Sequence, residues 1–166
     1  MIVLGVDPGT AATGYGVVAR ARDGAVSLLE CGVIRTDARS PLPLRLKTIY
    51  EGLGEVLGRH TPTHMAVEGV FYAKNVRTTV VLGHARGVAL LAGTMNGLDV
   101  AEYSPAEIKN AITGTGRADK AQVQFMVMRL LRLRTAPEPA DAADGVAVAL
   151  CHCNASQLAT RLLQAR

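Results

Sequence analysis

Apolar residues fall into short runs near the start of the chain. Three runs, Ile2 to Asp7, Gly14 to Arg20 and Val26 to Thr36, are separated by the turn-rich segments PGTAAT and RDG. Short apolar runs joined by turns predict β-strands, and tight connections predict antiparallel pairing. We therefore expect the chain to begin with a three-stranded antiparallel meander.

After the meander, the pattern predicts strands and helices in alternation. Leucine and isoleucine recur at helical spacing within residues 41–60, and a longer helical pattern runs from about Asn75 to Asn96. The segments HMAVEGV and LDVAEYS, which begin at His64 and Leu98, predict two further strands. This part of the chain therefore adds two strands, each preceded by a helix.

The last third of the chain is predicted to be helical. Ser104, Pro105 and Glu107 supply a cap, a first-turn proline and an N3 acid, and they predict a short helix that ends near Thr113. A loop with the sequence GTGR leads to a helix from Asp119 to Leu133. The Pro-rich connector TAPEPA follows, and Asp141 opens the last helix.

The resulting order β-β-β-α-β-α-β-α-α-α predicts an α/β fold with a mixed five-stranded sheet flanked by helices. A chain of 166 residues is long enough to bury its own core. No repeat or long linker divides it, so we expect a single domain over residues 1–166.

Composition and charge narrow the function only slightly. The net charge of +4 favours an anionic partner such as nucleic acid, although a small basic excess also serves solubility. The longest apolar stretches, VALLA and VAVAL, are too short to span a bilayer, and the start of the chain shows no secretory leader. With an odd number of cysteines, 3, these features predict a cytoplasmic protein without membrane contact.

Four acidic residues stand inside or beside apolar segments. Asp7 ends the first strand and Glu68 lies within the fourth, while Asp141 and Asp144 share one face of the last helix. A desolvated carboxylate is costly unless it is paired or binds a metal. Two alternatives to metal binding remain open. N-capping of the last helix explains either Asp141 or Asp144, and a salt bridge to a basic neighbour explains Glu68. If the first and fourth strands are neighbours, their two acids can share one ion.

Oxygen ligands without histidine suit Mg²⁺ or Mn²⁺ better than zinc. Two such ions about 4 Å apart can activate a water and stabilise the leaving oxygen of a phosphodiester. The acids therefore predict a two-metal phosphodiesterase. The CHC sequence at Cys151–Cys153 lacks a second ligand pair, and we interpret it as idle thiols on the last helix.

The chain resembles the RuvC family of Holliday junction resolvases in five segments: GVDPGTAATGYGVV, AVEGVFYAKN, GHARGVAL, EYSPAEIKNAITGTGRADKAQV and ADAADGVAVAL…HC. The resemblance implies an RNase H-like nuclease fold. It also implies a crossover junction endodeoxyribonuclease that resolves four-way DNA junctions by paired symmetric nicks in homologous recombination and DNA repair. Two Mg²⁺ or Mn²⁺ ions per active site, a homodimer built partly on the helix that contains GHARG, and a branch-migration complex of the RuvA and RuvB type are implied as well.

The resemblance also implies roles for individual residues. The family's acidic positions correspond to Asp7, Glu68, Asp141 and Asp144 as metal ligands and catalytic residues. Two basic positions of the family correspond to Lys109 and Lys120, and the aromatic position next to the catalytic acid corresponds to Phe71. Lys120 is expected to stabilise charge near the scissile phosphate.

Residues near these acids are expected to contact DNA. Aromatic side chains can stack on the unpaired bases of a junction, and cations hold phosphates without reading sequence. An ordinary surface loop and a solvated basic face explain the same residues without DNA. The expected contacts are Phe71, Tyr72, Lys74, Arg77, Lys109, Arg117 and Lys120.

Two departures from the family pattern are visible. Gly69 stands where many members have Gln, and Gly145 lowers helix propensity by about 1 kcal/mol relative to Ala. Neither removes a ligand, so they bear on local contacts rather than on the chemistry.

Two other functions remain open. The segment DPGTAATGYG is similar to the phosphate-1 loop of actin-like and sugar-kinase ATPases, which predicts a phosphotransferase, but 166 residues leave no room for a second lobe. A non-catalytic junction-binding protein is the other alternative. The four acids argue against it, because a DNA-binding surface should not carry uncompensated negative charge.

Overall fold

The computed structural model describes residues 1–69 and 76–164, without the side chains of residue 77 and residues 158–164. Within these residues it forms a five-stranded sheet with the order β3-β2-β1-β4-β5. The first three strands pair antiparallel, as predicted, and β4 and β5 run parallel to β1, so the sheet is mixed. The strands are β1 (Ile2–Asp7), β2 (Ala12–Arg20), β3 (Val26–Arg35), β4 (His64–Glu68) and β5 (Asp99–Tyr103).

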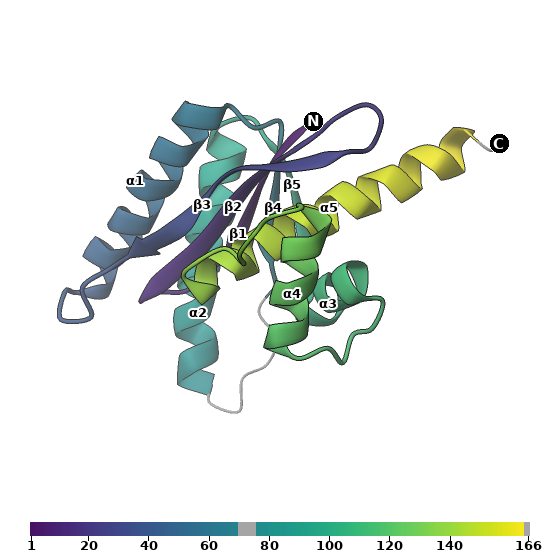
Figure 1. Ribbon diagram of the computed structural model, residues 1–166. Helices are drawn as coiled ribbons and strands as arrows, with labels where there is room; N and C mark the ends of the chain where they lie inside the picture. Colours follow the sequence, from purple (N-terminus) through teal and green to yellow (C-terminus); the bar gives the residue numbers. More distant parts are fainter. Residues whose placement is uncertain (70–75, 165–166) are drawn as a thin grey trace.

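Helices cover both faces of the sheet (Figure 1). One core cluster joins α1 and α2 to the sheet, and the other joins α3, α4 and α5 to its opposite face. Neighbouring residues of β1 divide between the two clusters, because side chains alternate along a strand. The helices are α1 (Leu42–His60), α2 (Val76–Met95), α3 (Pro105–Thr113), α4 (Lys120–Leu130) and α5 (Ala140–Gln164).

The sequence predicted where α3 and α4 begin more accurately than where α4 ends. Ser104 and Glu107 form the expected capping box of α3, and Asp119 caps α4 through the backbone N–H of Gln122. Helix α4 ends at Leu130 rather than Leu133, because Arg132 adopts a positive φ of 54° that breaks the helix. Among the described helices, none is long and apolar enough to cross a membrane.

Helix α5 lies unusually close to the centre of the sheet. A Cβ atom at Gly145 would lie 2.5 Å from the Cα of Tyr15, and side chains at Gly5 and Gly16 would overlap the backbone of α5. Glycine therefore lets the helix backbone rest directly on β1 and β2. This close approach explains why Gly145 stands in a helix despite its low helix propensity.

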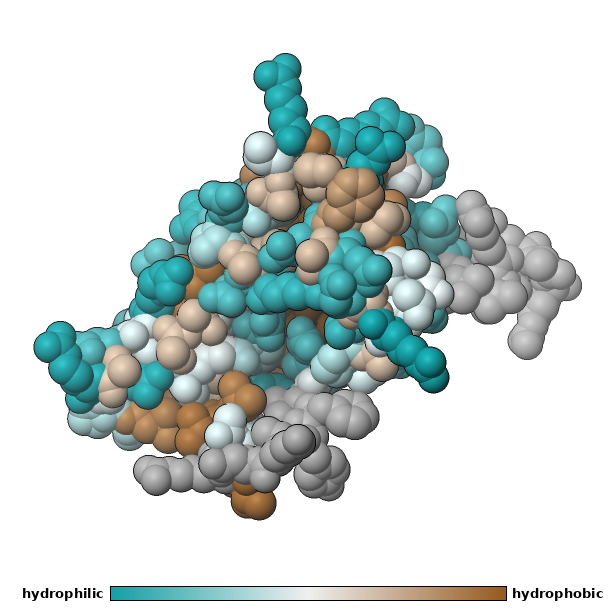
Figure 2. Space-filling model, turned by 60° about the horizontal axis from the view of Figure 1, so that its bottom comes forward, coloured by the Kyte–Doolittle hydropathy of each residue, from teal (hydrophilic) through white to brown (hydrophobic). Residues whose placement is uncertain are grey.

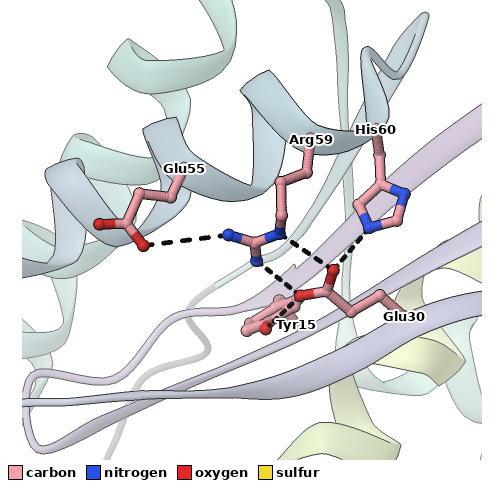
Figure 3. A network of polar contacts seen from close by, with 5 residues as sticks. All are labelled: Tyr15, Glu30, Glu55, Arg59 and His60. Atoms are coloured by element: carbon pink, nitrogen blue, oxygen red, sulfur yellow. Dashed lines mark hydrogen bonds and ion pairs between the residues drawn. The ribbon is translucent and has the colours of Figure 1, made fainter.

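A polar network fastens the C-terminal end of α1 to β2 and β3 (Figure 3). Glu30 accepts hydrogen bonds from the Tyr15 hydroxyl at 2.7 Å and from Arg59 at 2.6 Å, and the His60 Nε2 atom lies 2.6 Å from its other oxygen. The hydrogen bonds from Arg59, helped by those from His60 and Tyr15, lower the pKa of Glu30 to about 2. Glu30 is therefore ionised at neutral pH and holds three elements together.

Candidate active site

One pocket of about 240 Å³ lies at the end of the sheet where β1 and β4 finish. We call it the acidic pocket. Figure 2 looks at this end of the molecule, and hydrophilic side chains cover much of its centre. The pocket is lined by Asp7, Glu68, Pro105, Ile108, Lys109, Lys120, Val123, Asp144 and Ala147.

Two of the lining acids come from neighbouring strands. Strands β1 and β4 are parallel, and Val6 pairs with Val67 in their register. Asp7 and Glu68 directly follow these paired residues, so both acids leave the sheet at the same edge. The condition set by the sequence, that the first and fourth strands be neighbours, is therefore met.

The helix acids reach the pocket to different extents. Asp144 lines the pocket, whereas Asp141, in the first turn of α5, does not belong to its lining. Asp141 is nevertheless near enough to raise the pKa of Asp7 by charge repulsion. The close packing of Gly145 on Tyr15 brings this part of α5 onto the sheet.

The acids are crowded and partly shielded from water. Burial, and then the charges of Asp144 and Asp141, raise the pKa of Asp7 to about 6. Burial, and then the charges of Asp7 and Asp144, raise the pKa of Glu68 to about 7. Desolvation and like charges both disfavour ionisation, so this site is electrostatically suited to receive a cation.

Two lysines supply positive charge to the pocket. The Lys120 Nζ atom donates a hydrogen bond to the Asp144 Oδ2 atom at 2.7 Å, which raises the pKa of Lys120. Lys109, on α3, also lines the pocket, and its charge opposes part of the rise in the pKa of Glu68. The Lys120 ammonium thus partly neutralises the acids, in addition to any metal ion that they bind.

The fit of the site to a metal ion depends on its donor atoms. As the side chains lie, no group of three or more His, Cys, Asp or Glu residues in the described part of the chain could hold an ion. Lys120 occupies one oxygen of Asp144. The donor set, carboxylate oxygens with raised pKa values, fits a hard divalent cation.

Of the other expected DNA contacts, the side chain of Arg117 alone lies within the part of the chain that the structure describes. Phe71, Tyr72 and Lys74 are outside the described residues, as is the side chain of Arg77. Arg117 is exposed between α3 and α4 and does not line the pocket.

Sequence reasoning missed the apolar wall of the pocket. Ile108, Val123 and Ala147 line it beside the predicted polar residues. Val123 and Ala147 each follow a predicted site residue by three positions, the spacing of one helix face. Helical spacing from Lys120 and Asp144 would have identified both.

The mixed sheet, with acids at the ends of two adjacent parallel strands, is the arrangement expected of an RNase H-like nuclease. The family model for "Crossover junction endodeoxyribonuclease RuvC" matches residues 3–152. A protein of that name from Desulforamulus reducens is 50% identical over 152 residues, which cover 92% of this chain and 93% of the relative. The chain therefore belongs to the RuvC family.

Solved structures agree with this assignment. The structure of Thermus thermophilus RuvC matches with a TM-score of 0.88 and 36% identity, over 96% of this chain and 98% of that one. T. thermophilus RuvC in complex with a Holliday junction substrate matches with a TM-score of 0.86 and 33% identity, over 95% of this chain and 96% of that one. The expected RNase H-like fold is confirmed.

Proposed function

We propose that Asp7, Glu68, Asp141 and Asp144 form the catalytic centre with which this chain cuts four-way DNA junctions. As a RuvC family member, the chain is a crossover junction endodeoxyribonuclease. The observation that carries the proposal is the meeting of Asp7, Glu68 and Asp144, from three separate elements, in one pocket with two lysines.

RuvC family nucleases are metal-dependent. We propose that the four acids hold two Mg²⁺ or Mn²⁺ ions, because hard cations prefer carboxylate oxygens. When bound, such ions activate water and stabilise the leaving oxygen of the phosphodiester. The raised pKa values of Asp7, about 6, and Glu68, about 7, support this proposal, since nearby positive charge would favour both ionised forms.

The lysines have two separate proposed roles. Lys120, held by Asp144, keeps an ammonium group at the pocket, where it stabilises negative charge that develops on the phosphate. Lys109 and Arg117 bind the phosphate backbone and position the strand. We retain Phe71, Tyr72, Lys74 and Arg77, which follow Glu68 in the sequence, as proposed contacts to unpaired bases and phosphates.

A homodimer fits a substrate with two equivalent strands, because a two-fold enzyme presents two equivalent sites. We propose that α2 forms part of the interface. Ala85 and Ala89 are buried towards the sheet, while Val80 and Leu91, on the other side of the helix, are each 54% exposed. Figure 2 shows hydrophobic side chains gathered on the lower left, the side of α1 and α2. Val80→Arg should therefore give a monomer in analytical ultracentrifugation.

We further propose that the chain works as a single nuclease domain over residues 1–166 in the cytoplasm. Its proposed partner is a branch-migration complex of the RuvA and RuvB type, since junction cutting has to be coordinated with junction movement. Co-sedimentation of the purified chain with such a complex on a synthetic junction tests this partnership.

The proposed catalytic centre is tested by nicking of a synthetic four-way junction in the presence of Mg²⁺. Wild-type protein should introduce paired nicks in opposing strands, and Asp7→Asn should bind the junction without cutting it. Asp37→Asn is the matched control, because Asp37 is exposed and bonded to Arg39 away from the pocket. Full cutting by Asp7→Asn would contradict the proposal.

The two alternatives from the sequence are not favoured. The relatives that match nearly the whole chain are named as junction endonucleases. Neither a phosphotransferase nor a non-catalytic junction-binding protein describes the chain better.

A further inference from the structure

Tyr103 is the last residue of β5 and lies beside Glu68, a residue of the acidic pocket, in the sheet. The sheet register pairs it with Glu68, and the Gly69 N–H donates a hydrogen bond to the Tyr103 carbonyl oxygen at 2.8 Å. The next residue, Ser104, caps α3, which carries Lys109 into the pocket. Any movement of Tyr103 is therefore passed on to an acid and a lysine of the site.

The side chain of Tyr103 reaches across to α5. Its hydroxyl shares a hydrogen bond of 2.9 Å with the Nδ1 atom of His152, and the two rings meet edge to face at 5.9 Å. His152 lies eight residues after Asp144 in the same helix, a rise of about 12 Å. The contact thus joins the strand that ends beside Glu68 to the helix that carries Asp144.

Stability alone does not account for a histidine at this place. His152 is only 6% exposed, and among the described residues its Nε2 atom is buried without a hydrogen-bond partner. Burial, and then the nearby His64 ring at 5.2 Å, lower the pKa of His152, so the ring is neutral at pH 7. A buried polar atom without a partner costs free energy that an apolar side chain would avoid.

We propose that the Tyr103–His152 hydrogen bond is a positioning contact that sets the distance between Glu68 and Asp144. Strand β5 is a short edge strand, paired only with β4 in the described sheet. A side-chain contact with α5 therefore helps to fix the position of its end. Catalytic groups tolerate little displacement, since a shift of about 1 Å can cost about 100-fold in rate. The inference rests on the proposed catalytic roles of Glu68 and Asp144.

The first test removes the hydroxyl and keeps the ring. Tyr103→Phe should lower the single-turnover cutting rate at saturating junction about 10-fold and leave the junction Kd within twofold of wild type. Tyr15→Phe is the matched control, because Tyr15 is also partly buried in the sheet and loses a hydroxyl bond of 2.7 Å to Glu30, away from the pocket. Equal cutting rates for the two variants, both folded by circular dichroism, would overturn the positioning role.

The second test uses rescue at the partner residue. His152→Asn keeps a polar atom near the position of Nδ1 and removes the unpartnered Nε2 atom, so it should cut more than half as fast as wild type. His152→Leu keeps the bulk without the hydrogen bond and should match Tyr103→Phe. If His152→Leu, folded at the assay temperature, cuts as fast as His152→Asn, the hydrogen bond has no role in positioning.

Glu68→Gln in the same assay separates the two proposals. Loss of cutting by Glu68→Gln together with a wild-type rate for Tyr103→Phe contradicts only the positioning contact. Full cutting by Glu68→Gln contradicts the proposed catalytic centre itself.

Discussion

The Lys120 ammonium lies 2.7 Å from an Asp144 carboxylate oxygen, and both residues line a pocket that also holds two acids with raised pKa values. A cation of the protein therefore competes with any bound ion for one of the proposed ligands. The Lys120 side chain is 55% exposed, so the pair is only partly desolvated and can exchange its partner.

Replacing Lys120 should separate its two effects. Lys120→Met should slow cutting at saturating junction by about 100-fold, the loss typical of one transition-state charge stabiliser. It should also lower the Mg²⁺ concentration for half-maximal rate, because Asp144 is released from its ion pair. Lys47→Met is the control, since Lys47 pairs with Glu51 on the surface of α1. Weaker junction binding with an unchanged saturated rate would instead make Lys120 a phosphate anchor.

Removing one acid should stabilise the metal-free protein. The folded-state pKa values of Asp7, about 6, and Glu68, about 7, lie above their ordinary values of 3.8 and 4.5. The folded state therefore binds more protons, and this contribution to stability is lost as the pH rises from about 4 to about 7. With EDTA at pH 8, Asp7→Asn should be more stable than wild type by about 1–3 kcal/mol.

Denaturant titrations at pH 4 and pH 8 check this expectation. The advantage of Asp7→Asn should disappear at pH 4, where wild-type Asp7 is already protonated, and Mg²⁺ at pH 8 should raise the stability of wild type more than that of the variant. A variant that is less stable than wild type at pH 8 would show that the acids do not repel one another.

The close packing of α5 predicts opposite effects for two glycine substitutions. Gly145→Ala should destabilise the protein by more than about 2 kcal/mol, because the new methyl group overlaps the Tyr15 backbone despite better helix propensity. Gly54→Ala in α1 meets no atom within 4 Å and should stabilise by up to about 1 kcal/mol. Urea denaturation measures both, and similar values for the two would contradict the close approach of α5.

The Glu30 network predicts an acid-labile contribution to stability. The folded-state pKa of Glu30, about 2, lies below its ordinary value of 4.5, so its contribution is present above pH 4.5 and is lost as the pH falls towards 2. Glu30→Gln should cost about 1.5–3 kcal/mol at pH 7, the range of hydrogen bonds to a charged group. In thermal melts from pH 2 to pH 7, the difference in stability between wild type and Glu30→Gln should shrink as the pH falls. A difference that stays constant would mean that the charge of Glu30 does not contribute to stability.

The meeting of Asp7 and Glu68 could be predicted because both end strands, and parallel neighbours finish at one edge. The Lys120–Asp144 pair could not, since the two residues are 24 positions apart and depend on how α4 packs on α5. From the sequence, Gly145 only lowers helix propensity, and its role in the close approach of α5 to Tyr15 depends on tertiary packing. The end of α4 at Leu130 could not be predicted either, because the residue with the positive φ is Arg132 and not a glycine, which would mark a helix end in the sequence.

Strands β1 and β4 each have a neighbour on both sides, whereas β3 and β5 form the two edges. In hydrogen exchange, edge strands open in small local fluctuations, while the most interior ones exchange only when the whole molecule unfolds. Asp7 ends β1, whose two neighbours are both interior strands, whereas Glu68 pairs with Tyr103 at the end of the edge strand β5. Local opening at the end of β5 therefore disturbs Glu68 before Asp7, and junction cutting should be lost at a lower temperature than the one at which the whole molecule melts.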